Sequence, residues 1–177
     1  VYGTAGKAPN RIERNVCYQS KNAALQVQGE ALVRKNLLLA SQGVALLSTD
    51  HQGKSRNLVV VHNTIAGKAL GARLTSWSGR EGMVFANNLV LSEGRALFFP
   101  KGSQGVTFSG NACAGHVQGA HPQAKLPGLQ AFVDLTWSGA RRDARPRPAA
   151  LSSGDPAYRV EHDLDRQPDI LARDRLE

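Results

Sequence analysis

Apolar and polar residues alternate in short runs that repeat around five asparagines over the first two thirds of the chain. The asparagines are Asn15, Asn36, Asn63, Asn88 and Asn111, and the steps between them are 21, 27, 25 and 23 residues. The residue three positions before each asparagine is always apolar, and so is the residue two positions after it. A period of about 20 to 50 residues is typical of a repeat architecture.

Each period predicts short strands separated by tight turns. The segments around the asparagines, such as 58–66 and 83–91, are rich in β-branched and large apolar residues and lack the three-four spacing of a helix. A further short apolar run follows each of the first four asparagines, at 23–28, 43–48, 72–76 and 95–99. The pattern therefore predicts about three strands in each period.

Three short strands per period without helices predict an all-β fold, a single-stranded parallel β-helix of about five coils over residues 1–115. Coils of such a solenoid stack ~4.8 Å apart, so that their inward side chains form apolar ladders. The asparagines are expected to stack as a ladder of amide hydrogen bonds and to take the left-handed backbone angles of a turn. An antiparallel β-sandwich also explains short strands and glycine turns, but not an asparagine fixed to the same apolar positions five times.

The two cysteines test this prediction. Cys17 and Cys113 occupy the same position in the first and fifth copies. Four coils would separate them by ~19 Å, whereas a disulfide needs Cα atoms within ~7 Å. Both are therefore expected to be free thiols that point into the core.

The two ends of the chain depart from the repeat. Residues 116–177 lose the period and predict an irregular C-terminal capping segment folded back along the coils. The arginines between 141 and 147 are interpreted as a solvated loop, because nearby acids balance them. At the other end, the first coil is under way by Asn10, and we expect further coils upstream in the full-length protein.

The charge lies on the repeats. Residues 1–115 contain 13 Lys/Arg and 5 Asp/Glu, a net charge of +8, whereas residues 116–177 contain nine of each. Such a field favours an anionic partner, although solubility is an equally good explanation. No segment approaches the ~18 apolar residues of a membrane span, none reads as a signal peptide, and no Cys/His cluster has zinc spacing.

Several segments resemble right-handed parallel β-helix repeat proteins, a group that contains polysaccharide lyases, epimerases and glycoside hydrolases. The resemblance rests on VVVHNTIAG (59–67), MVFANNLVLS (83–92), VTFSGNACAG (106–115) and the acidic DPAYRVEHDLDRQPD (155–169). The ending ILARDRLE departs from the Gly- and Ala-containing ending of that group. The resemblance implies a right-handed coil, a substrate groove on one strand face, and a secreted, periplasmic or cell-surface location. No catalytic motif matches residue by residue.

The candidate ligand-binding face is formed by the third strand of each period, which follows the two strands on either side of the asparagine. On these strands we expect an inward set of Leu25, Val27, Ala72, Leu74, Ala96 and Phe98. We expect an outward set of Gln26, Gln28, Arg73, Thr75, Leu97 and Phe99. The loops that follow (48–57, 76–82 and 100–105) contribute Asp50, His51, Lys54, Arg56, Trp77, Arg80, Glu81 and Lys101.

These side chains suit an acidic sugar chain. Basic residues would pair with uronate carboxylates, and Trp77, taken as an exposed loop residue, would stack on a sugar ring. The predicted substrate-binding set is Trp77, Arg80, Lys101, Lys54, Arg56 and Gln26. In a β-elimination, a cation such as Arg73 acidifies the proton beside the carboxylate and a base such as His51 removes it, so these two are the candidate catalytic residues. A solvent-exposed side chain without function is the simpler interpretation of His51.

The position before each asparagine is polar and variable, and we expect it to face solvent. It is held by Arg14, Lys35, His62, Asn87 and Gly110. His62 is therefore not counted among the candidate site residues, although it precedes a ladder asparagine.

The sequence thus predicts a carbohydrate-active or carbohydrate-binding protein for an anionic polysaccharide, with lyase-type elimination as the reaction if it is an enzyme. The alternative is a non-catalytic surface, adhesin or structural segment, or the C-terminal part of a larger enzyme. A nucleic-acid binder shares the basic character but needs aromatics interleaved on the basic face, which are not found. No cofactor, metal or membrane partner is expected. No motif indicates calcium binding, and the sequence does not exclude it. The oligomeric state is not predicted.

Overall fold

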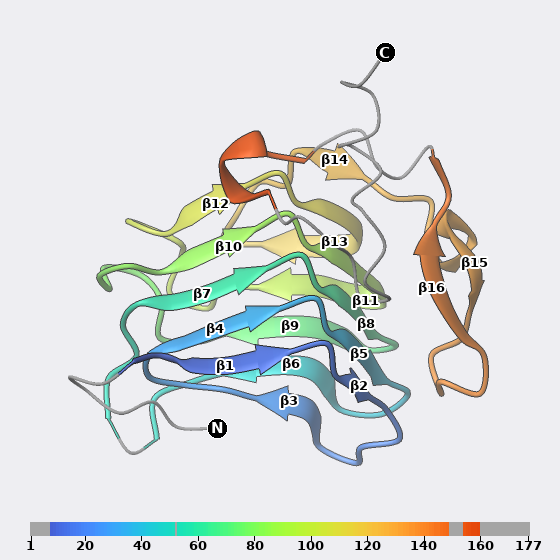
Figure 1. The fold of residues 1–177 in the computed structure, drawn as a ribbon, viewed down its shortest axis with the longest axis horizontal. Helices are drawn as coiled ribbons and strands as arrows, with labels where there is room; N and C mark the ends of the chain where they lie inside the picture. Colours follow the sequence, from blue (N-terminus) through green and yellow to red (C-terminus); the bar gives the residue numbers. More distant parts are fainter. Residues whose placement is uncertain (1–7, 52, 149–153, 160–177) are drawn as a thin grey trace.

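The computed structural model describes residues 8–51, 53–148 and 154–159 (Figure 1). It is an all-β solenoid of about four turns, in which parallel strands stack on one another and α-helices are absent from the described residues. This confirms the predicted parallel β-helix. One turn runs from each ladder asparagine to the next, so five asparagines bound about four turns. The number of turns is therefore slightly smaller than the predicted number of coils.

The strand that precedes each asparagine belongs to one five-stranded parallel sheet. Its strands, in order, are β1 (Asn10–Glu13), β4 (Ala31–Arg34), β7 (Leu58–Val61), β10 (Val84–Ala86) and β12 (Thr107–Ser109). The register aligns Ile12, Val33, Val60, Phe85 and Phe108 in one column. These are the apolar residues three positions before each asparagine, so the predicted inner ladder is confirmed.

Two further faces complete the coil. The second face contains β2 (Val16–Cys17), β5 (Leu37–Ala40), β8 (Thr64–Gly67) and the first parts of β11 (Leu89–Phe98) and β13 (Ala112–Gln118). The third contains β3 (Ala23–Gln26), β6 (Val44–Ser48), β9 (Leu70–Leu74) and the last parts of β11 and β13. On the second face, Cys17, Leu38, Ile65, Val90 and Cys113 share one column.

The asparagines form a continuous ladder between the first two faces. In each step, the side-chain oxygen of one asparagine accepts hydrogen bonds from the backbone N–H (3.0 Å) and the side-chain amide (2.9 to 3.1 Å) of the asparagine one coil earlier. After Asn111, the Oε1 atom of Gln123 accepts the backbone N–H at 3.0 Å. The predicted ladder is therefore confirmed, and Gln123 closes its C-terminal end.

The left-handed turn position was predicted one residue too late. The positive φ angles belong to the residue before each ladder asparagine: Arg14 (57°), Lys35 (55°), His62 (52°), Asn87 (53°) and Gly110 (63°). The ladder asparagine is instead held by its side-chain bonds. For example, the Nδ2 atom of Asn63 donates to the carbonyl of Val61 at 3.0 Å. Its amide therefore stabilises the turn without its own backbone becoming left-handed.

Both cysteines are free thiols, as predicted. Burial raises the pKa of both thiols, that of Cys113 to about 12. Because the thiolate is the reactive form, we expect iodoacetamide at pH 8 to leave Cys113 unmodified in the folded protein and to modify Cys17 slowly. Mass spectrometry before and after unfolding in guanidinium measures this, and rapid modification of Cys113 in the folded protein would contradict the coil assignment.

The chain after β13 first adds a short strand to the second face by parallel pairing with β13, and then continues outside the coils. It forms β14 (Ala124–Lys125), the 3-10 turn η1 (Leu129–Ala131), the antiparallel pair β15 (Phe132–Leu135) and β16 (Arg142–Pro146), and the 3-10 turn η3 (Pro156–Tyr158). Phe132 and Leu135 pack with Leu37, Leu39 and Leu91 on the outside of the second face (Figure 1). The β15–β16 pair therefore lies along the outside of the second face.

Candidate functional site

The third face presents one polar and aromatic column to the outside. The register places Gln26, Leu47, Arg73, Phe98 and Gln118 side by side on β3, β6, β9, β11 and β13. Their inward neighbours Leu46, Ala72 and Leu97 are fully buried. Gln26 and Arg73 are exposed, so their predicted outward positions are confirmed.

Part of the predicted outward set is wrong. Leu97 and Phe99 are buried in the core, and Phe98 points outward in their place. Residues 96–99 are all apolar, so the sequence does not show which of them alternate inward. Pairing with β9 decides this, because it aligns Leu97 with the buried Ala72. Gln28 is also buried, with only 3% of its surface exposed.

Two arginines gather on the outward ring of Phe98. The guanidinium carbon of Arg95 lies 4.2 Å from the ring centroid, and that of Arg73 lies 5.7 Å from it. Attraction to the face of the ring holds a guanidinium in place while its N–H edge remains available. We call Arg73, Arg95 and Phe98 the arginine–phenylalanine patch.

The patch carries uncompensated positive charge. Ion pairs to carboxylates are found for Arg11, Arg34, Arg56, Arg80, Arg141 and Arg145, and among the described residues neither Arg73 nor Arg95 has one. The strand next to Arg95 aligns the exposed His116 with it. The acid nearest in sequence, Glu93, accepts a hydrogen bond from the indole N–H of Trp137 at 3.0 Å and forms no ion pair with Arg95. Two fixed guanidiniums without an acid favour binding of an anionic group.

Trp77 is not an exposed loop residue. It is 0% exposed, and its indole N–H donates to the Ser48 hydroxyl at 2.8 Å. Its ring packs edge-on against Phe85 and Phe99, with centroids 6.2 and 6.1 Å away. The prediction of an exposed tryptophan is therefore wrong: the loop dips into the interior, and its serine neighbours gave no sign of this.

Two of the predicted basic ligands are engaged by acids. Arg80 donates to Asp50 at 2.9 Å, and Asp50 also accepts the backbone N–H of Ser55 at 3.0 Å. Arg56 donates to Glu30 at 2.6 Å. These pairs brace the loops between neighbouring coils, which lowers the positive charge that Arg80 and Arg56 offer to a ligand.

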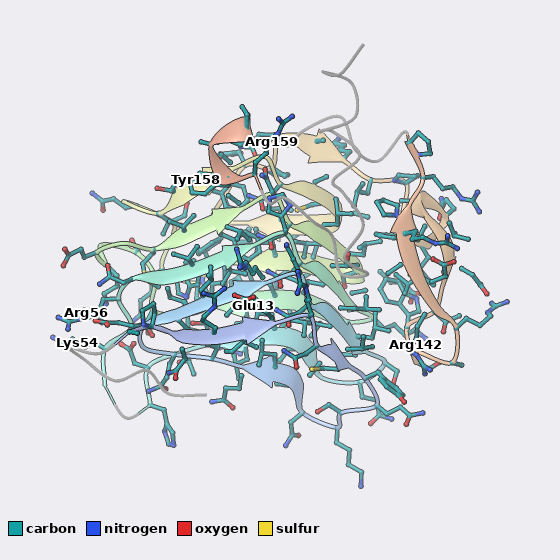
Figure 2. All side chains as sticks on the ribbon, viewed as in Figure 1. Glu13, Lys54, Arg56, Arg142, Tyr158 and Arg159 are labelled. Atoms are coloured by element: carbon teal, nitrogen blue, oxygen red, sulfur yellow. The ribbon has the colours of Figure 1, made fainter. Side chains whose placement is uncertain are left out.

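The remaining predicted residues lie at the surface. Lys54, Lys101 and His51 are exposed, and Figure 2 shows Lys54 beside Arg56 at the edge where the loops leave the coils. His51 comes from the loop after β6, the strand adjacent to the one that carries Arg73. The structure thus places the candidate catalytic residues on neighbouring coils.

The described part of the chain shows neither a metal-binding cluster nor a membrane-spanning helix. No three His, Cys, Asp or Glu side chains gather in the described ranges in a way that could hold a metal ion. No helix in that part of the chain is long and apolar enough to span a membrane.

In comparisons with known proteins, no protein-family model, no curated protein and no solved structure matches this chain.

Proposed function

We propose that the chain binds an anionic polysaccharide across the third face, with the arginine–phenylalanine patch at the centre of the site. The observation that carries this proposal is the pair of guanidiniums on one outward phenylalanine, without an acidic partner among the described residues. A regular strand face offers a long ligand equivalent positions one coil apart. A repeating anionic chain fits such a surface better than a single small anion does.

Gln26 and Gln118 extend the site along the outward column. Both are exposed and flank the patch on outer strands. Their amides can donate and accept hydrogen bonds, which suits sugar hydroxyls. Lys101, three residues after Phe98, adds a cation at the loop edge. Trp77 has no part in this site, because it is buried.

Within this proposal, lyase-type β-elimination is the reaction if the bound chain is cleaved. Arg73 would neutralise a uronate carboxylate, and His51 would remove the proton from the neighbouring carbon. That electron pair would form the C=C double bond as the glycosidic C–O bond breaks, and the leaving oxygen would take a proton from water or from protonated His51. The proposed ligand also implies a location outside the cytoplasm, where such polysaccharides are met. A non-catalytic binding or structural segment is the alternative, and product formation distinguishes the two.

The binding test compares polygalacturonate, alginate and chondroitin sulfate with neutral dextran. We expect the Arg73→Ala and Arg95→Ala variants each to weaken binding of the acidic glycans about tenfold, since a hydrogen bond to a charged group contributes about 1.5 kcal/mol or more. Isothermal titration calorimetry measures the affinities. Arg11→Ala, on a different sheet, is the matched control and should bind as the native protein does.

The same glycans test cleavage. Elimination produces an unsaturated sugar that absorbs in the ultraviolet, and we expect this absorbance to be lost in His51→Ala while binding is retained. Binding without absorbance would leave the binding proposal intact and reject the lyase step. Equal affinity for dextran and the acidic glycans would reject the proposal as a whole.

A further inference from the structure

Residues 154–159 form a short segment against the outside of the solenoid, which we call the C-terminal latch. It contains η3, and the Oδ1 atom of Asp155 caps this turn by accepting the backbone N–H of Ala157 at 2.9 Å. No residue of η3 is buried. Figure 2 places Tyr158 and Arg159 beside the upper coils. The latch is therefore held from outside and contributes no side chain of η3 to the core.

Two side chains of neighbouring coils hold the latch. The Oδ1 atom of Asn87 accepts the backbone N–H of Asp155 at 2.6 Å, and its Nδ2 atom donates to the carbonyl of Asp155 at 2.9 Å. The Nε2 atom of His62 bonds the carbonyl of Tyr158. We call Asn87 and His62 the keepers of the latch. Both occupy the left-handed position before a ladder asparagine. The prediction that this position simply faces solvent is therefore wrong for His62 and Asn87, and also for Lys35, which is 7% exposed.

The surface beside the keepers differs from the same surface in the lower coils. The outward column of the first sheet runs Glu13, Arg34, Val61, Ala86 and Ser109. Glu13 and Arg34 form an ion pair at 3.0 Å. Hydrogen bonds from Arg11 and Arg34 lower the pKa of Glu13 although burial opposes this. The column is thus charged at its first two positions, Glu13 and Arg34.

At the two coils that hold the latch, the column becomes apolar. Val61 is 6% exposed and Ala86 is 0% exposed. Neither belongs to the two hydrophobic clusters, whereas the residues before them on the strands, Val60 and Phe85, do. The residues that follow them in the chain are the keepers His62 and Asn87. The change from charged to apolar side chains therefore coincides with the attachment of the latch.

We propose that the C-terminal latch is a conformational device that opens as a unit and is controlled by His62 and Asn87. Segments that bury few side chains and are held by a few hydrogen bonds open at lower free energy than the surrounding core. The coils do not depend on the latch, since the asparagine ladder continues beneath it through Asn63, Asn88 and Asn111. The device lies on the first sheet and does not depend on glycan binding at the third face.

Asn87→Gly in the full chain tests the device. Glycine already occupies the same position at Gly110 with φ 63°, so this substitution keeps the backbone turn. It removes the amide that holds Asp155, donates to the carbonyl of Tyr158 at 3.4 Å and lies 3.2 Å from the Nε2 atom of His62. Arg14→Gly changes the same position in the first coil, away from the latch, and is the matched control. Backbone amide hydrogen exchange, followed by NMR, reports on the latch and on β7 and β10 in the same sample.

In the native protein we expect the amides of Asp155 and Tyr158 to exchange more slowly than in an unfolded chain and faster than those of β7 and β10. In Asn87→Gly the latch amides should exchange about tenfold faster, as expected for loss of a hydrogen-bond pair, while β7 and β10 are unchanged. Arg14→Gly should leave the latch rates as they are. Latch amides that exchange at unfolded rates in the native protein, that do not respond to Asn87→Gly, or that accelerate together with β7 and β10 would overturn the proposal.

Discussion

Asn63→Ala is expected to lower the free energy of unfolding by about 3 kcal/mol or more, because each buried polar group left without a partner costs about 1 to 3 kcal/mol. Asn63 is 1% exposed. Its side-chain oxygen accepts hydrogen bonds from the backbone N–H and the side-chain amide of Asn36. Its Nδ2 atom donates to the side-chain oxygen of Asn88 and to the carbonyls of Val33 and Val61. Alanine removes all of these bonds in the middle of the ladder. Denaturation in urea, followed by circular dichroism, measures the loss.

Asn15→Ala is the matched control for this substitution. Asn15 is the first rung and is exposed, so that water replaces much of what its side chain loses. We expect a loss of about 1 kcal/mol or less. Equal losses for Asn15→Ala and Asn63→Ala would mean that burial within the ladder does not contribute to the stability of the coils.

Trp77→Ala is expected to destabilise the protein by about 3 to 5 kcal/mol, the usual cost of removing a buried large aromatic side chain. The indole fills the space between Phe85 and Phe99, and its N–H satisfies the buried hydroxyl of Ser48. Trp77→Phe retains most of the volume and loses the hydrogen bond, for an expected cost of about 1 to 3 kcal/mol. Thermal unfolding of the two variants gives the comparison.

The same two variants separate a structural role from a ligand contact. If Trp77 is a core residue, folded Trp77→Phe protein should bind acidic glycans with native affinity. A variant of native stability that has lost glycan binding would show that the tryptophan contacts the ligand, against its burial.

The fold was predictable because the repeat fixes the register. An asparagine tied to apolar residues on both sides is sufficient to align Val33, Val60 and Phe85 in one column, and the strand pairing confirms this alignment. The turn geometry was predicted at the wrong residue. Asparagine tolerates left-handed angles, but here its side chain has a ladder to form, and the residue before it, such as Lys35, takes the left-handed angles.

The site was predictable only in part. Arg73 followed from simple alternation on β9. Phe98 did not, because the apolar run in which it lies hides the alternation, and Arg95 was not identified because its contact with Phe98 depends on an irregular pairing between β11 and β13. Trp77 was misplaced because loop composition does not reveal a side chain that turns inward. The latch joins residues 68 positions apart, Asn87 and Asp155, and no local pattern indicates such a contact.

The central claim is that the arginine–phenylalanine patch receives an anionic glycan, and NMR titration of the isotope-labelled protein with a short oligogalacturonate tests it most directly. We predict that the largest shift changes fall on the backbone signals of Arg73, Arg95 and Phe98 and on the guanidinium signals of the two arginines. These changes should spread to Gln26 and Gln118 and disappear in an Arg73→Ala, Arg95→Ala double variant. Changes centred on the first sheet or on the β15–β16 pair, or an absence of changes at saturating oligosaccharide, would contradict this claim.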